Sequence, residues 1–174
     1  MTSADLDDWH QAVGRLVSAA AVAERAVSQL ARALSGVNER SAPYLLPLEL
    51  DALVRIIRNL MPLHVRDRRL NDDVLEWTHQ VRKLYAVRTA VVHTVWQDTD
   101  ADSDEGMHPA WSNAGIADHP LTVAELVRTT RRITDLCGDP LEQLLRRVAE
   151  LAPALRIAGP AGRTDDGERS AGQA

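Results

Sequence analysis

The chain has 174 residues, of which 45% are hydrophobic and 26% are charged, and this size is sufficient to bury one core. Its formal net charge is −5 and its isoelectric point is near 5.6, which excludes a globally basic protein that coats nucleic acid. Only 3% of the residues are aromatic and none is Phe, which disfavours a β-sandwich or β-barrel core. Because the apolar residues are mostly Ala, Leu and Val, the composition favours an all-α protein.

Cys137 is the only cysteine, which excludes an internal disulfide and a zinc site built from several cysteines. The sequence contains no apolar run of about 18 residues, the length that a membrane-spanning helix needs. Its first residues are acidic, whereas a secretory signal peptide begins with basic residues. Together these features predict a cytoplasmic protein that does not associate with a membrane.

Apolar residues recur at alternating steps of three and four residues between Leu6 and Leu34. This spacing predicts one long helix that begins near Ser3 or Asp5 and ends near Gly36. Such a line of apolar residues, called the seam below, is typical either of a helix at the centre of a bundle or of a helix that pairs with another in a coiled coil. The seam positions are Leu6, Trp9, Val13, Leu16, Ala20, Ala23, Val27, Leu30 and Leu34.

Further helices are predicted in the next part of the chain. Residues 37–46 form a linker, and a second helix is expected to begin at Pro47 and to end at Pro62. A third helix is expected to begin at Asn71–Asp73 and to run to about Trp96. The apolar stripe of the second helix is Leu50, Leu53, Val54, Ile57 and Leu60, and that of the third is Val74, Trp77, Val81, Leu84, Val91 and Val95.

Residues 98–118 are predicted to form a long acidic loop, because they combine several acids with Gly and Pro and contain no Lys or Arg. Thr122 and Glu125 then match a capping box that begins a fourth helix, which is expected to end near Cys137–Gly138. A fifth helix is expected from Asp139 to about Leu155.

The predicted fold is therefore an antiparallel bundle of four or five helices, with the acidic loop before the fourth helix. Residues 1–156 form one domain in this prediction. Residues 157–174 are a polar, Gly-rich tail that is expected to be disordered.

Arg88 occupies the apolar stripe of the third helix, between Leu84 and Val91. An unpaired guanidinium is costly to remove from water, so this side chain must either pair with an acid or face a cleft. The first alternative gives Arg88 a structural role and the second a functional one. The acids available on neighbouring helices are Glu24, Glu49, Asp51 and Glu125.

His93 follows Arg88 with four residues between them, and Trp96 comes soon after the histidine. This Arg-x4-His motif, at the end of a long third helix of a small α-bundle, resembles the signature of the HEPN superfamily. In that family the residue after the arginine is polar and often Asn, and here it is Thr89. The resemblance covers the motif and its place within the bundle.

The resemblance implies a metal-independent endoribonuclease of a toxin or defence system, or an RNA-binding relative that has lost the chemistry. It implies no cofactor, and a homodimer in which two motifs meet; a protein partner such as an antitoxin is a further candidate. His93 would act as general base on a ribose 2′-OH or as general acid on the leaving 5′-oxygen, since imidazole exchanges protons near neutral pH. Arg88 would stabilise the charge on the phosphorane. The expected substrate-binding residues are Thr89, Arg82, Lys83 and Tyr85.

Some features leave a structural interpretation open. About 140° of helix rotation separates Arg88 from His93, and Thr89 lies directly beneath His93, where a Thr–His contact would be structural. Residues 52–97 carry eight basic and four acidic side chains, which suits a phosphate-binding patch or a solvated basic turn. The acidic loop either covers the groove that RNA would use or indicates that RNA is not the ligand.

No His-x3-His pair is present, and no metal site is expected. The alternative function is a non-enzymatic helical scaffold that dimerises or binds a protein partner. In that case Arg88 is sealed against a carboxylate and His93 faces bulk water.

Overall fold

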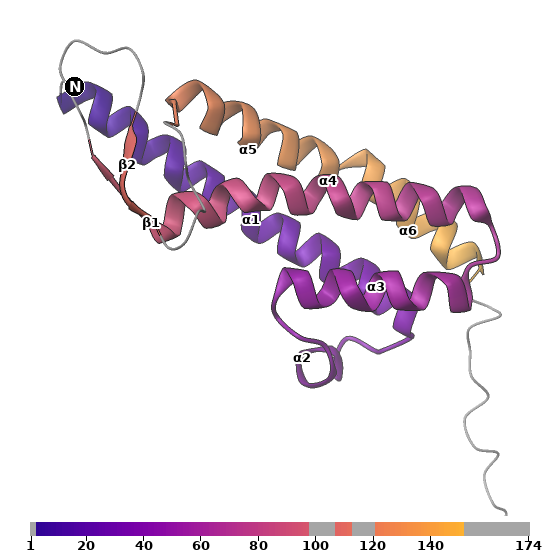
Figure 1. Ribbon diagram of the computed structural model, residues 1–174. Helices are drawn as coiled ribbons and strands as arrows, with labels where there is room; N and C mark the ends of the chain where they lie inside the picture. Colours follow the sequence, from indigo (N-terminus) through magenta and orange to yellow (C-terminus); the bar gives the residue numbers. More distant parts are fainter. Residues whose placement is uncertain (1–2, 98–106, 113–120, 152–174) are drawn as a thin grey trace, which may run out of the picture.

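A computed structural model of the protein describes residues 3–97, 107–112 and 121–151 (Figure 1). Within these ranges the fold is all-α, with about five helices packed together and one short antiparallel pair of strands. None of the described helices is both long and apolar enough to span a bilayer. The elements are α1 (Ser3–Ser35), α2 (Ala42–Leu45), α3 (Leu50–His64), α4 (Arg68–His93), β1 (Thr94–Gln97), β2 (His108–Ser112), α5 (Val123–Cys137) and α6 (Asp139–Leu151).

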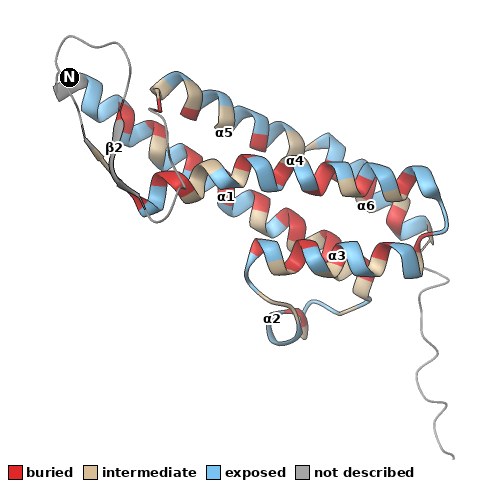
Figure 2. Cartoon of the chain, viewed as in Figure 1, coloured by how far each residue is buried: buried red, intermediate tan, exposed pale blue. Residues whose placement is uncertain are grey.

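The long helix α1 is the central element of the core, and it contacts α3, α4, α5 and α6. Leu16, Val27 and Leu30 on its predicted seam are 0% exposed, and buried and exposed residues alternate along the helices (Figure 2). The seam therefore packs against other helices of the same chain, as expected for the centre of a bundle. α1 is followed by Gly36, whose φ of 68° is the left-handed conformation that commonly ends a helix.

The second predicted helix differs from α3 at both ends. α3 begins at Leu50, not Pro47, because the backbone before it is extended and Glu49 takes the N-cap position. Pro62 lies inside α3 rather than ending it. Pro62 is exposed and sits in the last turn, where water can satisfy the carbonyl that lacks a donor. The predicted linker also contains the single-turn helix α2.

α4 begins earlier than predicted because Asp67 caps it. The Asp67 carboxylate accepts hydrogen bonds from the backbone N–H groups of Arg69 at 2.9 Å and Leu70 at 3.3 Å. α4 ends at His93 instead of Trp96, since the chain becomes extended at Thr94 and continues as β1.

The prediction of an irregular loop over the whole of residues 98–118 was wrong, because part of this segment forms β2. β2 pairs antiparallel with β1, with Thr94 opposite Ser112 and Gln97 opposite His108. Met107 also forms an isolated bridge with Leu121, just before α5. Backbone pairing with a partner strand is a tertiary effect that the acidic composition of the segment does not reveal.

The start of α5 agrees with the sequence. The Thr122 hydroxyl accepts from the Glu125 backbone N–H at 3.1 Å, and the Glu125 carboxylate accepts from the Thr122 backbone N–H at 2.9 Å. This reciprocal pair is the predicted capping box. The expected extension of the fifth helix to Leu155 and the expected tail of residues 157–174 lie outside the described residues.

Three side-chain contacts join α4 to α5 and α6. The Trp77 indole N–H of α4 donates to the Leu136 carbonyl oxygen of α5 at 2.8 Å. Arg147 of α6 lies 2.5 Å from an Asp73 oxygen and 3.5 Å from an Asp67 oxygen at the start of α4. These contacts join α4, which carries most of the site described next, to the neighbouring helices.

Candidate functional site

An open pocket of about 640 Å³ lies between the start of α3 and the second half of α4. Most of its α4 residues are three or four positions apart, so they share one face of the helix. The remaining residues come from the first turn of α3 and its N-cap. The pocket is lined by Arg82, Tyr85, Ala86, Arg88, Thr89 and His93 of α4, and by Glu49, Leu50 and Asp51 at the start of α3.

Arg88 and His93 both line this pocket, although about 140° of rotation separates their positions on an ideal helix. His93 is the last residue of α4 and is exposed, whereas Arg88 is half-buried. The arginine side chain is long enough to reach around the helix, and the end of the helix leaves the imidazole unobstructed. The two groups therefore open onto the same cavity within one chain.

Two of the acids considered as partners of Arg88 are held by other side chains. Glu24 of α1 accepts a short hydrogen bond from the Tyr85 hydroxyl. Asp51 of α3 accepts from Arg82 Nε at 2.7 Å, and both of these side chains are more than half exposed. Neither carboxylate forms an ion pair with Arg88 among the residues that the structure describes.

The other two acids do not neutralise Arg88 either. Glu125 is engaged with Thr122 in the capping box of α5. Glu49 lines the pocket, but no ion pair joins it to Arg88 in the part of the chain that the structure describes. The interpretation of Arg88 as half of a structural salt bridge is thus not supported by any described contact.

Tyr85 is the residue that contacts the Arg88 guanidinium. The guanidinium carbon lies 5.5 Å from the centre of the Tyr85 ring, a cation–π distance. The pKa of Tyr85 is raised, first by burial and then by its hydrogen bond to Glu24. The N–H groups of the guanidinium are donors that suit an anion such as a phosphate.

Thr89 donates its hydroxyl proton to the Tyr85 carbonyl oxygen at 3.4 Å, one helical turn earlier. No described hydrogen bond joins Thr89 to His93. Such back-bonding is common for threonine within helices and has a structural role. Among the described residues, the structural alternative of a hydrogen bond between Thr89 and His93 is therefore not supported.

Lys83 is the one predicted site residue that does not line the pocket. It is exposed on α4, between Arg82 and Leu84, and it points away because neighbouring helical positions lie on different faces. The sequence analysis named Glu49 and Asp51 only as possible partners of Arg88, and it assigned none of Glu49, Leu50 and Asp51 to the site. These residues line the pocket only because α3 packs against α4. The apolar periodicity of each helix does not predict how the two helices pack together.

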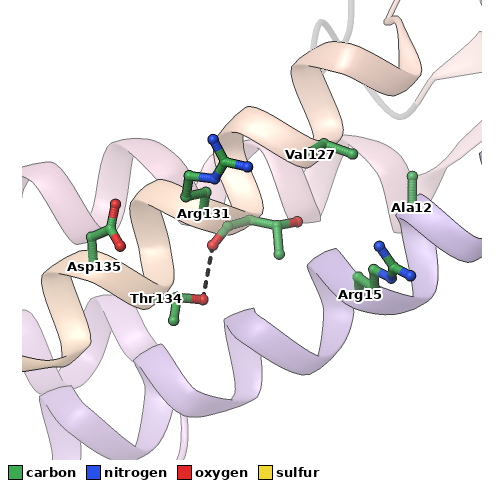
Figure 3. Close-up of a pocket in the computed structure, with 7 residues that line it drawn as sticks. Ala12, Arg15, Val127, Arg131, Thr134 and Asp135 are labelled. Carbon is green, nitrogen blue, oxygen red and sulfur yellow. Dashed lines mark hydrogen bonds between the residues drawn. The ribbon is translucent and has the colours of Figure 1, made fainter.

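A second pocket, of about 270 Å³, lies between α1 and α5 (Figure 3). Arg15 of α1 and Arg131 of α5 line it, and the hydroxyl of Thr134 donates to the Thr130 carbonyl oxygen at 3.1 Å. Among the described residues, no imidazole or thiol lines this pocket. The pocket between α3 and α4 is therefore the better candidate for proton-transfer chemistry.

Within residues 3–97, 107–112 and 121–151, no three His, Cys, Asp or Glu side chains gather closely enough to hold a metal ion. No family model, curated protein or solved structure matches the chain. The comparisons thus support no family assignment, and the structure shows an all-α helical protein in the residues that it describes. The resemblance to the HEPN superfamily rests on Arg88, His93 and their place at the end of α4.

Proposed function

We propose that the pocket between α3 and α4 binds an RNA phosphodiester and cleaves it without a metal ion, as the resemblance to the HEPN superfamily implies. The observation that carries this proposal is that Arg88 and His93 line one open pocket of a single chain. RNA cleavage by its own 2′-OH needs a group that moves a proton and a cation that stabilises the developing charge. The imidazole of His93 meets the first need, and the guanidinium of Arg88, which has no carboxylate partner among the described residues, meets the second.

In the proposed reaction the ribose 2′-oxygen attacks the adjacent phosphorus, and the bond from phosphorus to the 5′-oxygen of the next nucleotide breaks. His93 takes the proton from the 2′-OH or gives a proton to the leaving 5′-oxygen. Arg88 donates hydrogen bonds to the non-bridging phosphate oxygens, which gain charge in the transition state. The products are a 2′,3′-cyclic phosphate and a 5′-hydroxyl.

The remaining pocket residues are proposed to bind the substrate. Arg82, Tyr85 and Thr89 line the cavity, so they are placed to contact the nucleotides on either side of the reacting phosphate. Lys83 lies outside the cavity, and its proposed role is to contact the RNA backbone further along the strand. A homodimer, which the resemblance implies, would supply a second His93 for the proton transfer that the first cannot perform.

Incubation with total RNA in the presence of a chelator tests the proposal. His79→Ala is the matched control for His93→Ala, because His79 is exposed on the same helix and does not line the pocket. We expect wild type and His79→Ala to cleave RNA, and His93→Ala to cleave it at least about 100-fold more slowly. Equal cleavage by all three proteins would contradict the role of His93.

The protein could also bind RNA without cleaving it, and this result would lead to a different conclusion. If wild type binds RNA and Arg88→Ala weakens that binding while none of the proteins cleaves, the pocket is an RNA-binding site that has lost its chemistry. If wild type neither binds nor cleaves RNA, the proposal fails. Thermal unfolding curves must accompany both assays, since removal of a half-buried arginine can also lower stability.

A second candidate function, a helical interaction module, is favoured by a different observation. Tyr44 and Leu45 of α2 and Leu48 before α3 are 88%, 66% and 85% exposed. Neighbouring large apolar side chains with this exposure are typical of interaction surfaces. This candidate predicts that wild type sediments as a dimer and that Tyr44→Ser with Leu48→Ser sediments as a monomer. A dimer that survives both substitutions would contradict self-association through this surface.

A further inference from the structure

Glu24, Tyr85 and Arg88 form a continuous series of contacts from α1 to the pocket. The Tyr85 hydroxyl donates to Glu24 Oε1, and the Arg88 guanidinium packs on the ring of the same tyrosine. Glu24 does not line the pocket itself. The contact between Glu24 and Tyr85 spans 61 residues of sequence, so it joins two helices that meet only in the folded chain.

We propose that Glu24 is a positioning residue for Arg88, which it holds toward the pocket through the hydroxyl and the ring of Tyr85. This inference rests on the proposed function, in which Arg88 contacts the reacting phosphate. The tyrosine ring is attached at one end to α4 and hydrogen-bonded at the other end to α1. Because the ring is held at both ends, its face has a fixed position against which the Arg88 guanidinium packs.

This arrangement uses a carboxylate to orient an arginine without neutralising it. A carboxylate placed directly on Arg88 would occupy two of its N–H donors, as bidentate Arg–carboxylate pairs do. Here Glu24 acts on the hydroxyl of Tyr85, and the described residues leave the Arg88 donors without a carboxylate partner. A phosphate that enters the pocket would therefore meet a guanidinium that packs on Tyr85 and that no described carboxylate neutralises.

The Tyr85 hydroxyl must be protonated to donate this hydrogen bond to Glu24. Burial and the neighbouring Glu24 raise the pKa of Tyr85, so the hydroxyl keeps the proton that it donates. Glu49 and Asp51 also line the pocket, and Asp51 pairs with Arg82 while its charge adds to the rise in the pKa of Tyr85. The same contact would also be expected in a purely structural role, so the test needs a signal from Arg88 itself.

The Nε–Hε group of an arginine gives its own signal in a ¹H–¹⁵N spectrum, and Arg88→Lys identifies that of Arg88 as the one that disappears. In Tyr85→Phe and in Glu24→Leu, we expect the heteronuclear NOE of this signal to fall toward that of an exposed arginine such as Arg131. Glu142→Leu is the matched control for Glu24→Leu, because Glu142 is exposed on α6 and does not line the pocket. An unchanged NOE in both variants would overturn the proposal.

Kinetics on an RNA substrate give the second measurement. Tyr85→Phe and Glu24→Leu are expected to lower kcat by about 10- to 100-fold with a smaller change in KM, because misplacement of a group costs most in the transition state. Glu24→Gln, which keeps an accepting oxygen, should restore part of the lost kcat. Variants that lower the melting temperature while kcat and the NOE stay unchanged would show a merely structural contact and overturn the proposal.

The two proposals fail in distinguishable ways. If wild type cleaves no RNA but the Arg88 NOE falls in Tyr85→Phe and Glu24→Leu, the proposed function is wrong and the positioning of Arg88 by Glu24 is supported. If wild type cleaves RNA and both variants match it in kcat and NOE, the proposed function stands and the positioning role is overturned.

Discussion

The indole N–H of Trp96 donates a hydrogen bond to the Val91 carbonyl oxygen at 3.0 Å, across the end of α4. The last carbonyls of a helix lack intrahelical donors, so this bond satisfies one of them just before His93. The Trp96 ring also packs against Trp9 of α1, with ring centres 5.7 Å apart and planes inclined at 56°. The end of α4 that carries His93 is thereby attached to α1.

Replacement of Trp96 by Phe removes the donor and keeps an aromatic ring against Trp9. We expect the free energy of unfolding to fall by about 1 kcal/mol, the net worth of one hydrogen bond. RNA cleavage should also slow, because the last turn of α4 no longer holds His93 in place. Chemical denaturation and initial cleavage rates measure the two effects. Unchanged stability together with full activity would show that this bond does not fix the end of the helix.

Asp51 is expected to weaken RNA binding, because it neutralises Arg82 at the rim of the pocket. Both side chains are more than half exposed, so the ion pair adds little to stability and Asp51→Asn should fold normally. We expect this variant to bind RNA about three- to tenfold more tightly at low salt, with a steeper dependence on salt concentration. Fluorescence anisotropy gives the Kd values.

Asp72→Asn is the matched control for this comparison, since Asp72 is exposed on α4 and does not line the pocket. If the two variants gain the same affinity, the effect comes from net charge and not from the release of Arg82. Weaker binding by Asp51→Asn would mean that the ion pair orients Arg82 for the substrate.

The single thiol is expected to be unreactive in the folded protein. Burial raises the pKa of Cys137 to about 11, and only the thiolate reacts with disulfide reagents. At pH 8 the native protein should react with a chromogenic disulfide about 100-fold more slowly than the protein unfolded in guanidinium chloride. The released chromophore reports both rates by absorbance. Similar rates in the two states would show that Cys137 is not shielded.

Acid is expected to weaken the start of α4 through Asp67. The hydrogen bond from the Leu70 backbone N–H is the largest of the contributions that lower the pKa of this carboxyl, and Arg147 adds to them. Because the folded-state pKa lies below that of the unfolded chain, ionised Asp67 stabilises the fold above the unfolded value. This contribution is lost as the pH falls through the folded value.

Asp67→Asn tests this pH dependence, because asparagine can still cap the helix but cannot ionise. We expect wild type to melt at a higher temperature than the variant at pH 7. The difference should shrink as the pH falls below about 4, where the carboxylate becomes protonated. If the difference in melting temperature stays constant across this range, the substitution acts through the geometry of the helix cap and not through the charge of Asp67.

The parts of the fold that depend on local sequence were predictable. The three- and four-residue spacing in α1 corresponds to buried positions such as Leu16 and Leu30, and the capping box of Thr122 and Glu125 forms as expected. Both signals involve residues within a few positions of each other. Helix geometry therefore decides both features, and a short window of the sequence is enough to reveal them.

The features that depend on distant parts of the chain were not predictable. β2 pairs with β1 across a segment whose acids and glycines suggest only a loop. Arg88 and His93 line one pocket, but the motif predicts this only if α4 is known to end at His93. The bond between Tyr85 and Glu24 needs α1 and α4 to be packed together, and no local pattern encodes that packing.

Analysis of the ends produced from a synthetic oligoribonucleotide, in the presence of a chelator, tests the central claim most directly. If His93 and Arg88 promote attack by the ribose 2′-OH, mass spectrometry should find fragments with a 2′,3′-cyclic phosphate and matching fragments with a 5′-hydroxyl. His93→Ala should leave the oligonucleotide intact. Fragments from wild type that carry a 5′-phosphate and a 3′-hydroxyl would contradict the claim, as would an oligonucleotide that wild type leaves uncut.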